Sequence, residues 1–176
     1  GSMAKGTMNI ATGVEVQNSG KTFHIGKLTG NGALGGSCTF SNGSSVGANT
    51  WQVGNDDSWS TLVTVTSNAN LVKVGSGKIT WNGANNNTGN TTVNEGELCV
   101  GSAGHLGSGQ LTVAADGVFS GNVKATNPLS NSVVTINGTI RPGVSDGATT
   151  GVLYFDNSSM TIAEDGVLST GVLSCA

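Results

Sequence analysis

The chain has 176 residues and a formal net charge of −3, and 29 glycines accompany only 10% charged residues. This composition excludes a highly charged disordered chain, and the scattered basic residues lack the electrostatic footprint of a nucleic-acid-binding protein. No apolar run approaches the roughly 20 residues that span a bilayer, so we expect this part of the chain to be soluble.

The sequence favours an all-β fold. Val and Thr favour strands, and Gly and Asn serve turns, whereas windows rich in helix-forming residues are almost absent. Residues 1–3 are typical of an expression-vector remnant. Residues 4–70 alternate short strands with turns and match no regular repeat, so we interpret them as irregular coils or an N-terminal cap. The strands predicted there are Val14–Val16, Thr22–Ile25, Cys38–Phe40, Thr50–Val53 and Leu62–Val65.

Residues 71–176 form a more regular region, which we interpret as part of a longer protein. Its predicted strands are three to five residues long. They are Leu71–Val74, Lys78–Trp81, Thr91–Val93, Glu97–Val100, Gln110–Val113, Val118–Ser120, Val133–Ile136, Thr139–Arg141, Val152–Phe155, Met160–Ile162 and Val167–Ser169.

A short phrase recurs four times in this region. Each copy has Thr followed by a β-branched apolar residue, a polar turn with Gly, and a second apolar residue. The β-branched residues, which lie 20, 23 and 26 positions apart, are Val93, Val113, Ile136 and Ile162. Such a period predicts a β-solenoid in which each unit forms one coil. We therefore expect these four side chains to stack in one interior ladder, and a second ladder of Leu98, Phe119, Ile140 and Leu168 beside it.

An antiparallel β-sandwich is the alternative fold. The pairs Asn82-Gly83 and Asn137-Gly138 are compatible with tight hairpin turns. The very short strands and the sustained period favour the solenoid.

Residues 71–98 also carry a family resemblance. Spaced Leu, Lys, Gly, Asn, Thr and Val residues resemble the autotransporter-associated β-strand repeat, also called the passenger-associated transport repeat. The matching positions are Leu71, Lys73, Gly75, Gly77, Gly83, Asn85, Gly89, Thr91, Val93, Gly96 and Leu98. The chain departs at Trp81, where Leu is common, and at Asn87, where an aromatic residue is usual. The Asn- and Trp-rich variant, with Thr50–Gly54, is similar to surface proteins of Bacteroidales.

The resemblance implies a right-handed parallel β-helix in an exported surface protein of a Gram-negative bacterium. It implies a non-catalytic stalk or passenger segment, outside the cell or on the outer-membrane surface, that supports adhesion. Host or environmental glycans or surface proteins are the expected partners, and any membrane attachment would come from anchor or translocator domains elsewhere. Because a β-helix leaves strand edges open at its ends, end-to-end self-association is also expected.

Acidic residues provide a second functional hypothesis, a β-helical enzyme acting on acidic polysaccharide. Such an enzyme needs at least two carboxylates and a basic residue in one groove. The close acidic groups are Asp56-Asp57, Glu95/Glu97 and Glu164-Asp165. The enzyme hypothesis also considers Asp116 and the basic residue Arg141, and it fails if Glu97, Asp116 and Arg141 lie on separate faces. Their separation in the repeat favours solvent-exposed turn carboxylates.

A carbohydrate-binding module is a third hypothesis. Trp51 and Trp59 flank Asp56 and Asp57, and two indoles with nearby carboxylates are suited to stacking and hydrogen bonding a glycan. The alternation of Trp51 with Val53 instead favours packing in the core or a cap. Trp81 occupies a Leu position of the repeat, so we expect it in the core.

No cofactor or metal site is predicted. His24 and His105 lie far apart in sequence, and Cys38, Cys99 and Cys175 show no metal-binding spacing. We expect Cys38 to be a small buried residue and Cys99 to face away from its neighbours.

Overall fold

The chain forms an all-β stack in a computed structural model that describes residues 2–18, 20–35, 49–101, 103–123, 129–143, 151–169 and 172–175. No helix occurs in these residues. The strands of the first half are β1 (Ser2–Ile10), β2 (Glu15–Gln17), β3 (Thr22–Gly30), β4 (Ala33–Gly35), β5 (Thr50–Val53), β6 (Trp59–Thr61), β7 (Thr64–Val65), β8 (Asn70–Lys73) and β9 (Lys78–Trp81). Those of the second half are β10 (Thr91–Val100), β11 (Leu111–Gly121), β12 (Val133–Ile136), β13 (Thr139–Pro142), β14 (Val152–Phe155), β15 (Ser159–Ile162), β16 (Val167–Leu168) and β17 (Val172–Cys175).

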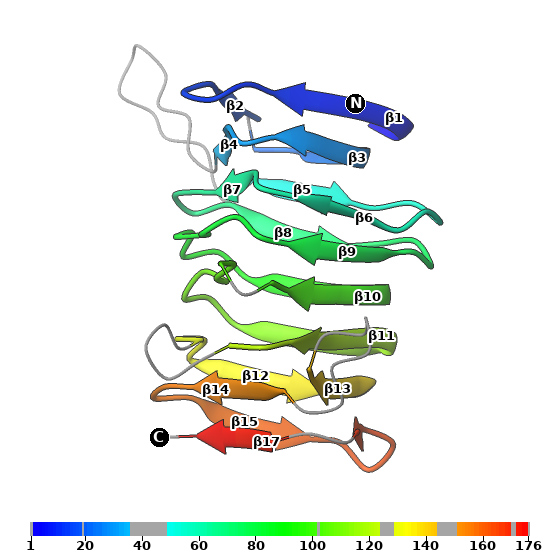
Figure 1. Cartoon of the computed structure of the whole chain (residues 1–176), viewed down its shortest axis with the longest axis vertical. Coiled ribbons are helices and arrows are strands. Elements are labelled where there is room, and N and C mark those ends of the chain that lie inside the picture. Colours follow the sequence, from blue (N-terminus) through cyan, green and yellow to red (C-terminus); the bar gives the residue numbers. More distant parts are fainter. Residues whose placement is uncertain are drawn as a thin grey trace.

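The strands lie one above another in sequence order from the N-terminus to the C-terminus (Figure 1). We call the longest row the first face; its order is β1-β3-β5-β8-β10-β11-β12-β15. At a corner, β10 bends: its first part pairs with β8 and its last part pairs with β9. The row β6-β9-β10-β11-β13-β16, which includes the later parts of β10 and β11, forms the second face.

The third face is less regular. Strands β2, β4 and β7 pair at the N-terminal end, and β14 pairs with β17 at the C-terminal end. Between them, bridges and backbone hydrogen bonds continue the stack, for example from Asn86 N–H to the Val65 carbonyl and from Ser108 N–H to the Asn87 carbonyl. Three faces therefore enclose one long core.

The fold is a right-handed parallel β-helix. Every pairing between the named strands is parallel. The antiparallel sandwich considered as an alternative is therefore wrong. Asn82-Gly83 and Asn137-Gly138 form corners between two faces of one coil and not hairpins, since the strands on either side pair with other coils and not with each other.

Both predicted ladders are present in the register. The first contains Val93, Val113, Ile136 and Ile162, and the second contains Leu98, Phe119, Ile140 and Leu168. The first three residues of each ladder are fully buried, but Ile162 is 38% exposed and Leu168 is 49% exposed. The prediction of interior positions is thus wrong for these last two residues, because no described strand covers the final coil.

Corners between faces need residues without bulk. Gly96 has φ +65°, and a Cβ added there would lie 2.4–2.7 Å from the carbonyl oxygens of Gly75, Ser76 and Gly77 in the preceding coil. Only glycine tolerates both the left-handed backbone and this close approach. The corner glycines of the repeat are therefore required by the spacing of the coils.

Polar side chains inside the third face satisfy buried backbone groups. The Trp81 indole is fully buried, as predicted, and donates to Asn85 Oδ1 at 3.0 Å. The same oxygen accepts the Val65 backbone N–H at 2.8 Å. Asn87 and Asn131 donate to backbone carbonyls of neighbouring turns. These asparagines replace hydrogen bonds that a regular strand would make.

The strand predictions agree best where the repeat is regular. Strands β5, β9, β12 and β14 match their predicted bounds, and β10 and β11 each join two predicted strands into one bent strand. The sequence failed to predict β1, β4, β6 and β17. The predicted strand Cys38–Phe40 and the residue Cys38 lie outside the described residues.

The N-terminal part belongs to the same stack. Ser2 and Met3, interpreted as part of a vector remnant, lie in β1 opposite His24 and Ile25. The step from Thr22 in β3 to its partner Thr50 in β5 is 28 residues, whereas Leu71 to Thr91 is 20 residues. This longer coil explains why no regular period is visible before residue 70.

The ladder predicts a strong position dependence of stability. Phe119→Ala should lower the free energy of unfolding by about 3–5 kcal/mol, because it leaves a cavity in a fully buried position. Leu168→Ala, at the exposed end of the same ladder, is the control and should cost less than about 1 kcal/mol. Urea denaturation measures both, and equal losses would contradict a closed core that opens only at its end.

Candidate functional site

Four polar side chains from successive coils meet on the outer surface of the second face. Lys78 comes from β9, Glu97 from β10, Ser120 from β11 and Arg141 from β13. Glu97 accepts a hydrogen bond from the Ser120 hydroxyl at 2.6 Å and from Arg141 Nη2 at 2.5 Å. Lys78 Nζ lies 3.6 Å from the same carboxylate. We call these four residues the Glu97 cluster.

The electrostatics keep the Glu97 carboxylate ionised. Burial alone would raise its pKa, and its side chain is only 14% exposed. The hydrogen bonds from Ser120 and Arg141, together with the charges of Arg141 and Lys78, outweigh burial and hold the pKa below its usual value.

This geometry describes a clamp across coils. A glycosidic acid–base pair needs two carboxyl groups with different protonation states, roughly 5–10 Å apart. Among the described residues, the Glu97 cluster contains one carboxylate, which is ionised and held by three partners. The observed contacts support a role in holding four coils in register.

The sequence did not predict the Glu97 cluster, since it placed the acidic groups in different parts of the repeat. The cluster could have been predicted by placing the acidic and basic residues relative to the second ladder. Glu97 precedes the ladder residue Leu98, and Arg141 follows Ile140, so both point outward from the same face of the stack. The length of the arginine side chain then closes the distance between coils.

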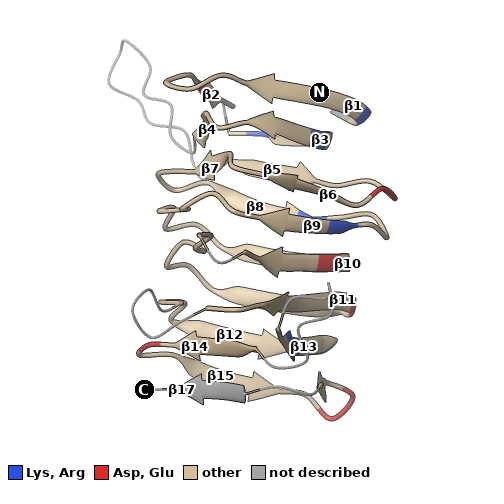
Figure 2. Cartoon of the chain, in the orientation of Figure 1, with Lys and Arg blue, Asp and Glu red and all other residues tan. Residues whose placement is uncertain are grey.

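The remaining acidic residues of the three groups gather along one edge of the stack, the corner between the first and second faces (Figure 2). Glu95 is opposite Asp116 in the next coil, and both are exposed, as expected for turn carboxylates. Glu164 and Asp165 are exposed at the corner of the last coil. Among the described residues, no three His, Cys, Asp or Glu side chains are placed to hold a metal ion.

The indole pair lies in the core. Trp51 is 1% exposed, donates to the Gly35 carbonyl at 2.9 Å and packs edge-on against Phe23. Trp59 is 8% exposed and is in register with Ile79 in the second face. Neither ring presents a face to solvent, so the surface glycan platform is not formed.

The two aspartates that were grouped with these indoles are exposed. Ser76 donates to Asp56 from its hydroxyl at 2.9 Å and from its backbone N–H, and these bonds lower the Asp56 pKa. Asp57 accepts from the side chain of Asn55. Their contacts are therefore to turns of their own and the adjacent coil.

A buried lysine is the most unusual charged group. Lys73 is 1% exposed and occupies the interior position between Val53 and Val93. Its ammonium donates to the carbonyls of Val74, Gly75 and Glu95 at 3.0, 2.6 and 2.9 Å. Burial lowers its pKa to about 8. In the sequence, only the alternation of Lys73 with the apolar Leu71 indicates this interior position.

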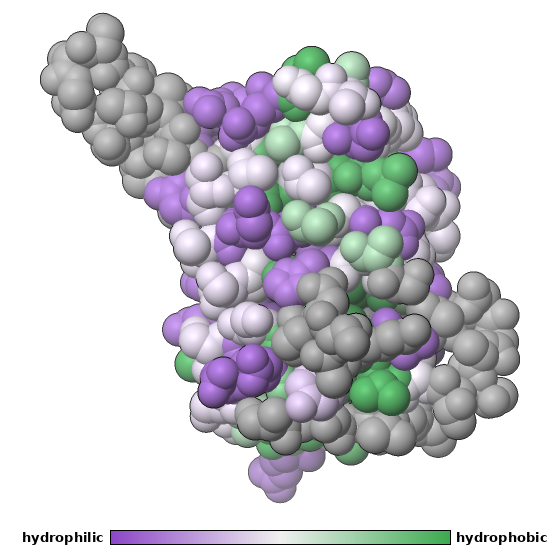
Figure 3. Space-filling view, turned by 60° about the vertical axis from the view of Figure 1, so that its left-hand side comes forward, coloured by the Kyte–Doolittle hydropathy of each residue, from purple (hydrophilic) through white to green (hydrophobic). Residues whose placement is uncertain are grey.

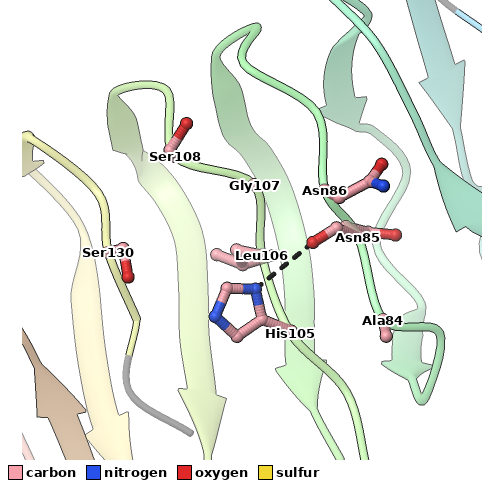
Figure 4. A pocket seen from close by; sticks show the side chains of 8 residues that line it. All are labelled: Ala84, Asn85, Asn86, His105, Leu106, Gly107, Ser108 and Ser130. Carbon is pink, nitrogen blue, oxygen red and sulfur yellow. Dashed lines mark hydrogen bonds between the residues drawn. The ribbon is translucent and has the colours of Figure 1, made fainter.

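An open depression of about 400 Å³ lies on the third face around His105 (Figure 4). His105 Nδ1 is 3.2 Å from the Asn85 carbonyl oxygen, and Leu106 and Ser130 line the same surface. His24 lies in β3, and its Nε2 is 3.0 Å from the Gly54 carbonyl oxygen. Both rings contact the backbone of neighbouring coils, which accounts for their positions without a ligand.

The surface shown in Figure 3 intersperses hydrophilic residues with small hydrophobic areas among the described residues. Cys99 is buried.

Comparison with protein-family models, with curated proteins and with solved structures finds no match for this chain. This chain's own sequence and structure therefore carry the evidence about its function.

The clamp predicts a pH-dependent contribution to stability. Glu97→Gln should lower the free energy of unfolding by about 1–3 kcal/mol at neutral pH, because it removes the charge that Arg141 and Lys78 face. Since the folded pKa of Glu97 is lowered, the difference should persist above the ordinary value of 4.5 and vanish as the pH falls through the folded pKa. Chemical denaturation across this range tests it.

Glu95→Gln is the matched control for Glu97→Gln. It removes the same charge from the same strand at an exposed position and should change stability by less than about 0.5 kcal/mol. If both variants lose equal stability, the clamp does not stabilise the stack.

Lys73 predicts a second rise of stability with pH, in an alkaline window. Between about pH 8, its folded pKa, and 10.5, its ordinary value, the unfolded chain binds more protons than the folded one. The free energy of unfolding should therefore rise with pH in this window, by on the order of 1–3 kcal/mol. Lys73→Met should lack the rise, whereas Lys21→Met, at an exposed lysine, should retain it. Urea denaturation at several pH values decides between these outcomes.

Proposed function

We propose that this chain is a non-catalytic β-helical stalk segment of a secreted or cell-surface protein, a rigid scaffold that supports adhesion. The observation that carries the proposal is the uninterrupted parallel pairing along the first face, from β1 to β15 (Figure 1). Each coil adds about 4.8 Å to such a stack. The mechanism is geometric, since the stack holds a distal region at a fixed distance from its base.

The side-chain chemistry supports a structural role. The Glu97 cluster links four coils, Lys73 binds three corner carbonyls, and Trp51, Trp59 and Trp81 fill the core. These groups, which are the chemically richest of the described residues, are occupied by contacts within the stack. A rigid spacer needs such contacts, because it must resist bending between coils.

The proposed location is the exterior or outer-membrane surface of a Gram-negative bacterium. It rests on the resemblance of residues 71–98 to the autotransporter-associated repeat. Loops between coils, or regions of a longer protein beyond this chain, would contact host or environmental glycans or proteins.

Duplication of one coil tests the stalk. Inserting a second copy of residues 71–90 after Asn90 preserves the register, since Leu71 and Thr91 are partners 20 residues apart. Each added copy should lengthen the particle by about 4.8 Å in small-angle X-ray scattering. A Gly/Ser insert of equal length at the same place is the control, and should form a flexible loop without a fixed increment.

Two results would contradict the stalk. One is a duplicated chain whose length does not increase by a constant step per copy. The other is cleavage of an acidic polysaccharide by the unaltered chain that Glu97→Gln abolishes while the variant stays folded, which would assign the Glu97 cluster to catalysis.

A further inference from the structure

The second face contains a break in its strand pairing, between β3 and β6. Like β10, β3 bends, and its later part, residues 27–30, pairs with residues 7–10 of β1. In the next coil, β6 pairs with β9 but not with β3. Among the described residues, no backbone hydrogen bond joins residues 26–31 to residues 55–63. Because β1 lies beyond β3 and β9 lies beyond β6, the two facing edges without a strand partner are internal to the stack.

The two coils are held at their ordinary spacing on both sides of the break. On the side of the first face, the Gly54 N–H donates to the Ile25 carbonyl at 3.0 Å. On the side of the third face, the Thr64 N–H donates to the Gly32 carbonyl at 3.0 Å. A strand inserted between the coils would need about 4.8 Å on each side of itself. The break is therefore too narrow to accept a peptide strand.

An open depression of about 460 Å³ lies at this break. Thr29 and Asn31 line it from the coil of β3, Ser60 and Leu62 from the coil of β6, and Asn82 from the coil of β9. The residues that line it carry no charge. An ionic ligand would thus find no opposite charge in the lining.

The lining offers hydrogen-bonding groups that the fold does not use. Within the described part of the chain, the Ser60 hydroxyl and the Asn82 side-chain amide have no hydrogen-bond partner. Asn31 accepts from the Thr12 hydroxyl through Oδ1, which leaves the two donors of its NH2 group. Beside these polar groups, Leu62 is 55% exposed and supplies an apolar contact.

This combination matches a neutral saccharide. Each sugar hydroxyl both donates and accepts, so it pairs with amides, with hydroxyls and with backbone groups at an unpaired strand edge. The C–H groups of a sugar ring form an apolar face that covers an exposed aliphatic side chain. A pocket for a free cofactor buries most of its ligand, whereas an open depression suits one sugar unit within a longer chain.

We propose that the depression between β3 and β6 binds a neutral saccharide unit of a glycan. Leu62 contacts the apolar face of the ring, and Asn31 and Asn82 hydrogen-bond to its hydroxyls from the coils on either side of β6. The inference rests on the adhesive part of the proposed function and gives this segment a glycan contact of its own. This site is separate from the indole platform, whose rings are buried.

A glycan array tests the proposal. Biotinylated chain, made multivalent on streptavidin, is applied to neutral hexose and N-acetylhexosamine oligosaccharides and to their sialylated and sulfated forms. At least one neutral oligosaccharide should bind, and should show a dissociation constant on the order of 0.1–1 mM for the single chain in an NMR titration. The neutral oligosaccharide that gives the strongest array signal is the probe for the variants.

Two variants remove the apolar and the polar contact separately. Leu62→Ser and Asn82→Ala should each raise the dissociation constant about tenfold. Their thermal unfolding midpoints should stay near that of the parent, since neither side chain is buried. Val133→Ser and Asn137→Ala are the matched controls, because they make comparable changes at exposed positions of other coils. Both controls should leave the dissociation constant within about twofold of the parent.

Three results would overturn the proposal. They are no binding of any neutral oligosaccharide up to about 10 mM, binding of the sialylated or sulfated forms alone, and equal binding by the parent, Leu62→Ser and Asn82→Ala. None of these results affects the length increment of the duplicated coil, which tests the stalk. Conversely, a chain that binds the probe but does not lengthen by a constant step retains this site and loses the stalk function.

Discussion

The structure depends on one constraint: every coil must place equivalent residues directly above those of the coil before it. Parallel strands of adjacent coils are about 4.8 Å apart, so a side chain at an interior position contacts its equivalents above and below it. In the second face this produces the continuous row from Trp59 and Ile79 through Leu98 to Phe119. Burial of each such side chain contributes roughly 1.5–3 kcal/mol, and the row also fixes the register. The fold is thus stabilised by repetition along one axis.

The same constraint explains the polar groups that interrupt the rows. At each corner the chain leaves one sheet before it enters the next, and its carbonyls lose their strand partners. Lys73 lies at an interior position and directs its ammonium to three of these carbonyls. On the third face, where strands are short, the side chains of Asn85 and Asn87 also hydrogen-bond to buried backbone groups. A buried charge is tolerated at Lys73 because all three of its donors have acceptors.

The sequence was informative where equivalent positions carry similar residues. Val93 and Val113 share type, neighbours and a spacing of 20, so their stacking was predictable, as was the burial of Trp81. The clamp was not predictable from residue type, since Glu97 and Arg141 lie 44 positions apart. It becomes visible only when the ladder register is known and the reach of the arginine is added. The indoles Trp51 and Trp59 misled for a related reason: their polar sequence neighbours lie in turns, while the rings themselves lie on interior positions.

A coil in the middle of the stack is stabilised by contacts with the coils on both sides, so the coils at the ends are the least stable part. An interior coil has a partner on both sides, whereas the last coil leaves Ile162 and Leu168 partly exposed. Repeat proteins commonly solve this with a polar cap. In the described residues of this chain the last coil instead presents apolar ladder residues beside Glu164 and Asp165. Any further coil that continued the parallel pairing would bury these two side chains, as Ile136 and Ile140 are buried one coil earlier. The burial of a ladder residue in this fold is therefore a property of the coils on both sides of it and not of its own coil alone.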